Sequence, residues 1–166
     1  MVTDRRRAAF AFAIALAAAS AAVGCGSGSG SSSQKATANQ EAAAAATGDI
    51  PDNQVFLTYR NARQGYSLRY PEGWTQSGSG RDLTFGAKGN RVHLAVRAGS
   101  APGKTQKTSF TRRGTPDPVT GRRPLLLIDR YVYAGHGKVA TLELASPKGV
   151  DNVDAYKLIS RSFAWR

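Results

Sequence analysis

The sequence predicts an α+β domain: an antiparallel β-sheet, a meander of about six or seven strands, with a C-terminal helix packed on one face. Three observations predict this fold. Apolar and polar residues alternate in several short stretches, turn-forming residues separate those stretches, and the last apolar positions recur at steps of three and four. The domain covers residues 55–166, a length close to the commonest domain size and sufficient for one hydrophobic core.

Strands are predicted where apolar residues occupy every second position. The stretches 66–70 and 139–145 show this pattern, which is typical of strands with one buried face. In 91–97 the even positions are Val or Leu, and we expect them to face the core. The odd positions of that stretch, which then face away from the core, are Arg91, His93, Ala95 and Arg97.

Turn signals between the strands favour short antiparallel connections. They lie at 88–90, 116–121 and 135–137, and each contains Gly together with Asn, Pro, Asp or His. The run 125–128 is apolar without a break, which predicts a central strand that is covered on both faces.

A C-terminal helix is predicted to supply the second layer. Asp151 or Asn152 provides a side chain that can cap its first turn, and Asp154 complements the helix dipole there. The apolar stripe that we expect to pack on the sheet consists of Val153, Tyr156, Ile159 and Phe163.

Two motifs of this domain resemble the PsbP-like family. They are G-Y-S-L-R-Y-P-E-G-W at 65–74 and the ending 151–163, which closes with Ser-Phe after a helix. The family takes its name from an extrinsic photosystem II subunit and includes many exported bacterial proteins and lipoproteins. The resemblance extends over 55–166 and implies an antiparallel sheet flanked by helices. It implies no activity, because the family has no shared catalytic motif, and we expect no photosynthetic role.

Such domains often carry a further helix after the first strand pairs. The corresponding stretch here, 100–107, is rich in Pro, Gly and Thr, which disfavour a helix. We therefore expect that helix to be missing and one sheet face to be thinly covered.

The amino terminus has the pattern of a bacterial export signal. Three arginines, 5–7, precede the apolar run 8–23, which is mostly Ala and shorter than the ~20 residues of a membrane-spanning helix. The sequence A-V-G-C that ends at Cys25 resembles a lipobox, with Ala22 in place of the usual Leu. We expect residues 1–24 to be a signal peptide and Cys25 to be diacylated, with fatty acids such as palmitate.

Two other export routes remain open at this point. One is an ordinary secretory signal cleaved after an A-x-A site such as 17–19, and the other is twin-arginine export, whose pattern fits the residues around 5–7 poorly.

Residues 25–54 are predicted to form a flexible tether. They are rich in Gly, Ser and Ala and offer no face that could be buried. A chain of this length reaches roughly 30 Å. The predicted location is therefore the extracytoplasmic face of the cell membrane, with the domain held clear of the lipid by its tether.

The folded part carries the positive charge of the chain. The 23 Lys and Arg outnumber the 11 Asp and Glu by 12, and only four residues of each kind precede residue 55. The single cysteine forms no internal disulfide and, with two histidines, no zinc cluster. We expect neither a metal nor another cofactor.

Arginines are the candidate binding residues. One group of four flanks a single loop, and two more lie on the outward face of one strand. The candidates for an anion-binding site are Arg91, Arg97, Arg112, Arg113, Arg122 and Arg123. The alternative is a basic surface that is solvated throughout and binds nothing in particular. Export removes the chain from cytoplasmic DNA, so an anionic wall or lipid component is expected rather than nucleic acid.

These observations predict a lipid-anchored envelope protein that acts as a non-enzymatic binding or assembly module, with the membrane and an envelope protein or anionic component as partners. The alternatives are electrostatic association with anionic membrane or wall polymers, and a cell-wall hydrolase. The sequence contains no G-x-S-x-G elbow, P-loop or dinucleotide fingerprint, and we identify no catalytic residue. His93 lies in a strand and His136 in a glycine turn, positions that favour structural roles.

Overall fold

The computed structural model describes residues 40, 43, 47–100 and 105–166. Cys25, the predicted signal peptide and most of the predicted tether lie outside this part of the chain. Among the described residues, no helix combines the length and apolar character needed to cross a membrane.

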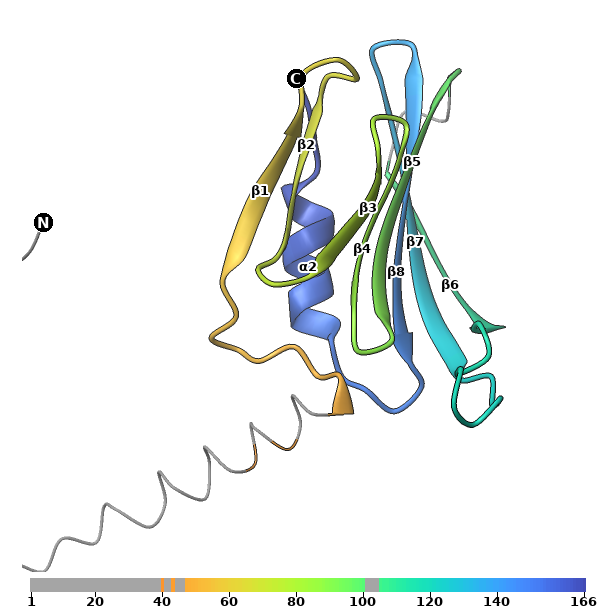
Figure 1. Cartoon of the computed structure of the whole chain (residues 1–166). Coiled ribbons are helices and arrows are strands. Elements are labelled where there is room, and N and C mark those ends of the chain that lie inside the picture. Colours follow the sequence, from red (N-terminus) through yellow and green to blue (C-terminus); the bar gives the residue numbers. More distant parts are fainter. Residues whose placement is uncertain (1–39, 41–42, 44–46, 101–104) are drawn as a thin grey trace, which may run out of the picture.

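The domain consists of two antiparallel sheets and a helix, which confirms the predicted α+β class (Figure 1). The large sheet has the spatial order β3 (Thr75–Ser79), β4 (Asp82–Ala87), β5 (Asn90–Ala98), β8 (Lys138–Pro147), β7 (Leu125–Gly135) and β6 (Gln106–Arg113). The small sheet has the order β1 (Phe56–Asn61), β2 (Tyr66–Pro71) and β9 (Ala164–Trp165). Helix α2 (Val153–Ser162) lies beside β2 and, like the small sheet, packs on one face of the large sheet.

The order of the large sheet places β8 at its centre. After β5 the chain crosses to the far edge as β6, then returns through β7 and β8. Two-residue turns join β4 to β5 and β7 to β8. Their central residues, Lys88 with Gly89 and His136 with Gly137, all have positive φ angles, as the hairpin turns that match strand twist require.

The main core fills the space enclosed by the large sheet, α2 and the small sheet. The buried even positions of 91–97 belong to it, as the alternation predicts. Its members from the sheets are Tyr66, Leu68, Leu83, Phe85, Val92, Leu94, Val96, Ala140, Leu142 and Leu144, and Tyr156, Ile159 and Phe163 complete it. Ile50 is also buried in this core, although it precedes the predicted domain start at residue 55.

Two details of the predicted burial are wrong. The run 125–128 is not covered on both faces: Leu125 and Leu127 are 37% and 48% exposed, and β7 is the second strand from the edge. Only its outer-face residues Leu126 and Ile128 are buried, against Ala145 and Phe110. Val153, predicted to pack on the sheet, is 56% exposed at the start of α2. The inner face is thus thinly covered beside β6 and β7.

Asn152 precedes α2 but does not cap it with its side chain. Instead its amide is buried, 4% exposed, and forms the centre of a polar network. Its Oδ1 accepts from the Ile50 backbone N–H at 2.8 Å, and its Nδ2 donates to Ser146 Oγ at 2.9 Å and to Asn90 Oδ1 at 3.1 Å. The network joins the start of the domain, β5, β8 and the helix.

Tyr156 extends this network into α2. Its hydroxyl donates to the Ala145 carbonyl at 2.7 Å and accepts from Ser146 Oγ at 2.8 Å. Burial raises the pKa of Tyr156 to about 12, so the hydroxyl remains a donor at neutral pH. The helix is therefore fixed to β8 by hydrogen bonds as well as by apolar packing.

We predict that Asn152→Ala lowers the free energy of unfolding by about 1–3 kcal/mol, because it leaves buried partners unsatisfied. Urea denaturation of the full chain at pH 7 measures the change. The exposed Asn53→Ala serves as the matched control and should change stability by less than about 0.5 kcal/mol. Equal effects of the two substitutions would contradict the role of the buried network.

Candidate functional site

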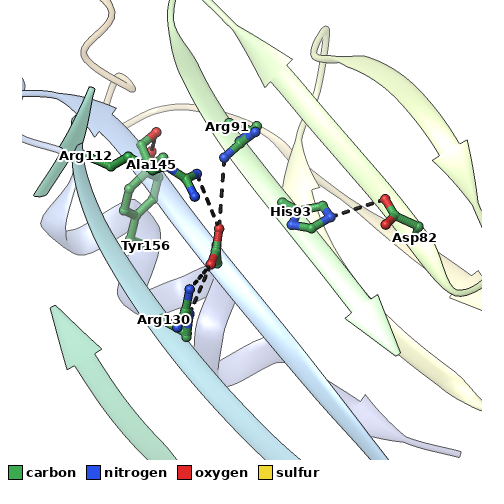
Figure 2. Close-up of polar contacts among 8 residues, drawn as sticks. Asp82, Arg91, His93, Arg112, Arg130, Ala145 and Tyr156 are labelled. Atoms are coloured by element: carbon green, nitrogen blue, oxygen red, sulfur yellow. Dashed lines mark hydrogen bonds and ion pairs between the residues drawn. The ribbon is translucent and has the colours of Figure 1, made fainter. Parts of the chain in front are cut away.

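Three arginines surround one buried carboxylate on the outer face of the large sheet (Figure 2). The Glu143 side chain is only 10% exposed. Arg130 donates to its Oε1 from Nε at 3.0 Å and from Nη2 at 2.6 Å. The Nη2 atoms of Arg91 and Arg112 lie 3.9 and 3.7 Å from Oε2. We call these four residues the Glu143 cluster.

The order of the strands assembles this cluster. Glu143 lies on the central strand β8, directly opposite Arg130 of β7, while Arg91 of β5 pairs with Ala145, two residues away. Arg112 reaches across from the edge strand β6. The Arg130 guanidinium also stacks over the Phe110 ring, with Cζ 4.8 Å from the ring centroid. Four strands therefore contribute to one site.

The cluster leaves a surplus of positive charge. Burial alone raises the pKa of Glu143, but the Arg130 hydrogen bond and the charges of Arg130 and Arg112 outweigh it and hold the pKa below its ordinary value. Glu143 is therefore ionised at neutral pH and balances one of the three guanidinium groups. The side chains of these arginines remain 39–47% exposed, so the remaining charge faces solvent.

A groove of about 640 Å³ opens beside the cluster. We call it the arginine groove, after the four arginines that line it: Arg91, Arg112, Arg113 and Arg123. Residues of β4, of the β4–β5 turn and of 114–116, together with Leu126, complete its walls, and none of its lining residues is acidic. The Nε of Arg91 is buried and has no hydrogen-bond partner among the described residues.

The β6–β7 loop holds Arg123 at the same groove as Arg112 and Arg113 of β6. Gly114 N–H donates to the Pro124 carbonyl at 2.8 Å, which closes the base of the loop. At its tip, Asp117 Oδ1 accepts from the Thr120 backbone and hydroxyl at 2.7 and 2.9 Å and from the Val119 backbone at 3.0 Å. These hydrogen bonds, those of Thr120 first, lower the pKa of Asp117. The loop is thus ordered by its own turn chemistry.

The structure brings four of the six candidate arginines together. Arg122 lies in the β6–β7 loop but is not among the residues that line the groove. Arg97 lies on β5 six residues beyond Arg91, about 20 Å along the strand. Cys25, the predicted lipidation site, lies outside the described residues. The sequence interpretation missed Arg130 and Glu143, because their convergence depends on β8 lying between β5 and β7.

The two histidines make contacts that are typical of structural rather than catalytic residues. His93 Nε2 lies 3.2 Å from Asp82 Oδ1 on the outer face of the sheet (Figure 2). The His136 ring contacts the Trp165 indole edge to face, with 6.3 Å between the centroids. In the part of the chain that the structure describes, no serine hydroxyl is bonded to either ring, and no three His, Cys, Asp or Glu side chains gather to hold a metal ion.

We predict that Glu143→Gln destabilises the fold by about 1–3 kcal/mol at pH 7, because it removes the charge that binds three arginines. The folded pKa of Glu143 lies below its ordinary value of 4.5, so ionisation stabilises the fold above that value and the benefit is lost as the pH falls through the folded pKa.

Thermal unfolding between pH 7 and pH 3 measures this effect. The melting temperature of Glu143→Gln should lie below that of wild type at neutral pH, and the difference between the two should shrink below about pH 4.5. The exposed Glu72→Gln is the control and should leave stability unchanged at both ends of the range. A Glu143→Gln effect that is constant across this range is incompatible with a role for its charge.

No known family matches the chain in a scan against family models, and no curated protein matches it. Several solved structures show a distant likeness to this chain. A protein from Bacteroides thetaiotaomicron superposes with a TM-score of 0.47 at 12% sequence identity, over 66% of this chain and 48% of that protein, so this chain spans about half its length. The cyanobacterial PsbP (CyanoP) of Synechocystis superposes with a TM-score of 0.43 at 16% identity, over 72% of this chain and 98% of its own.

Proposed function

We propose that the chain is a lipid-anchored, non-enzymatic binding module of the bacterial envelope, and that its arginine groove binds the phosphate groups of anionic lipid at the membrane face. The observation that carries this proposal is the groove itself, in which four arginines from β5, β6 and the β6–β7 loop line one surface and none of the lining residues is acidic.

The position of the groove relative to the tether supports a membrane ligand. Asn90 lines the groove, and its Nδ2 donates to the carbonyl of Gly48, near the amino-terminal end of the described range 47–100. Residues 47–50, the β4–β5 turn and the β6–β7 loop lie at the same end of the domain (Figure 1). A tether from an acylated Cys25 therefore meets the domain at the end that carries the groove.

The chemistry of the groove suits phosphate. Guanidinium groups bind phosphate oxygens through two parallel hydrogen bonds and retain their charge at every physiological pH. Each Lys or Arg near an anionic bilayer contributes about 1 kcal/mol to association. The lipid anchor supplies proximity, and the arginines then orient the domain on the membrane surface.

A non-enzymatic role is supported by the surroundings of the titratable groups. His93 is paired with an Asp82 side chain that is 76% exposed, and neither lies in a closed cavity with a nucleophile. The pKa shifts of Glu143 and Asp117 accompany ion pairs and a turn, which are structural causes.

We predict that Arg113→Gln together with Arg123→Gln weakens binding to anionic vesicles. The full chain carries Cys25→Ser in this experiment, so that no acyl chain contributes. Losing two charges near the surface, at about 1 kcal/mol each, corresponds to roughly 30-fold weaker partitioning onto phosphatidylglycerol vesicles. Neither residue contacts Glu143, so thermal stability should stay unchanged.

Arg63→Gln with Arg97→Gln is the control, because it removes the same charge from exposed positions outside the groove. It should weaken partitioning much less than the groove variant. Equal losses for both variants, or binding that high salt leaves unchanged, would show that the groove is not the docking site. The anchor is tested separately by mass spectrometry: a mature, unacylated amino terminus upstream of Cys25 contradicts it.

A further inference from the structure

A second basic groove, distinct from the arginine groove, lies between the β1–β2 hairpin and the exposed side of α2. It has a volume of about 660 Å³. We call it the helix groove and define it by its five basic residues: Arg60, Arg69, Lys157, Arg161 and Arg166. None of the candidate residues identified from the sequence belongs to it.

Strand alternation and helix periodicity bring these residues together. Arg60 pairs with Ser67 and Arg69 with Thr58, so both arginines lie on the same face of the β1–β2 hairpin. On α2, Lys157 and Arg161 are four residues apart and share one side of the helix. The hairpin face and this helix side form the two walls of the groove.

Hydrogen bonds fix the walls against one another. Ser162 Oγ accepts from the Arg69 backbone N–H at 2.8 Å, which joins the end of α2 to β2. Arg166 Nε donates to Ser67 Oγ at 3.0 Å, which holds the guanidinium against the hairpin. The groove is thus built from backbone elements in fixed register rather than from a loop.

The charge of the helix groove is largely uncompensated. Its single acidic lining residue, Asp154, forms an ion pair with Lys157 at 3.0 Å. Within the described ranges, Arg60, Arg69 and Arg161 have no carboxylate within ion-pair distance. Three exposed guanidinium groups therefore face one groove, with hydroxyl groups of Thr58 and Ser162 beside them.

We propose that the helix groove binds a ligand that carries two or more phosphate groups. The side chains that surround it are hydrogen-bond donors with fixed positive charge, and the guanidinium fork matches phosphate oxygens. Lys157 and Arg161 are about 6 Å apart along the helix axis, and the hairpin arginines face them from the other wall. One phosphate engages only part of this set, whereas linked phosphates engage both walls.

The test is calorimetric titration of the full chain, held in a neutral detergent, with inorganic tripolyphosphate and with orthophosphate as probes. Tripolyphosphate should bind at least about tenfold more tightly than orthophosphate, because each additional charged hydrogen bond is worth about that factor. Arg60→Gln with Arg161→Gln should weaken tripolyphosphate binding at least about tenfold, and thermal unfolding checks that the variant remains folded.

A gain-of-binding variant makes the test independent of any loss of fold. Asp154→Asn removes the one acidic side chain among the described residues that line the groove and should tighten tripolyphosphate binding several-fold. Weakened or unchanged binding in this variant counts against the proposal. Titration with long-chain polyphosphate distinguishes a polymeric ligand from a small one. If each long chain binds more tightly than tripolyphosphate, the ligand is a polymer. If the two affinities are equal, the ligand is a small molecule.

Two further variants separate this site from the arginine groove. Arg63→Gln with Arg97→Gln should leave tripolyphosphate binding within about twofold of wild type. Arg113→Gln with Arg123→Gln removes two phosphate-binding residues of the arginine groove only, so the tight tripolyphosphate site that Arg60→Gln with Arg161→Gln weakens should persist in that variant. If the Arg113 and Arg123 variant abolishes it while the Arg60 and Arg161 variant does not, the helix groove is not the site. No detectable tripolyphosphate binding to the wild-type chain also overturns the proposal, without bearing on the membrane role of the arginine groove.

Discussion

The basic outer face of the domain depends on the buried carboxylate of Glu143. Arg91, Arg112 and Arg130 approach this one group from three strands, and without it three like charges would be held close together. A buried carboxylate is in turn stable only where cations and hydrogen bonds replace its water. The acid and the arginines therefore require each other, and the surplus charge remains at the surface, where it can meet a ligand.

On the opposite face of the sheet, the buried side chain of Asn152 fixes the position of the arginine groove relative to the point where the chain enters the domain. Asn152 ties the backbone of Ile50 to β8 and to Asn90 at the β4–β5 turn. The chain consequently enters the domain beside the turn that borders the arginine groove. The same network that anchors α2 thus fixes the groove at the end of the domain that adjoins the predicted tether.

The elements with strong local patterns could be predicted from the sequence. The alternation of apolar and polar residues predicted β5 and β8, and the Gly-His-Gly turn predicted the hairpin that joins β7 to β8. The three- and four-residue spacing of apolar residues predicted α2. The strands β3 and β6 lack such a signal, because nearly all of their residues are exposed. Buried asparagines are also hard to predict, since Asn152 has the sequence position of a helix cap and yet points inward.

Sites that depend on contacts between distant segments could be predicted only in part. The arginines that flank the β6–β7 loop were identified because the loop brings neighbours in sequence together in space. Glu143 and Arg130 were not, because nothing local indicates that β8 lies between β5 and β7. The helix groove could not be predicted for the same reason, because its two walls are about 90 residues apart in the chain. The sequence of each wall alone has the pattern of an ordinary solvated surface.

The proposed function requires that lipid phosphate occupies the arginine groove. NMR titration of the ¹⁵N-labelled full chain carrying Cys25→Ser with short-chain phosphatidylglycerol tests it most directly, because each arginine Nε–H gives its own signal. We expect the Nε–H signals of Arg91, Arg112, Arg113 and Arg123 to shift and to saturate together, while the Arg97 signal stays unmoved. Shifts that spread evenly over the surface arginines, or that spare these four, would contradict it.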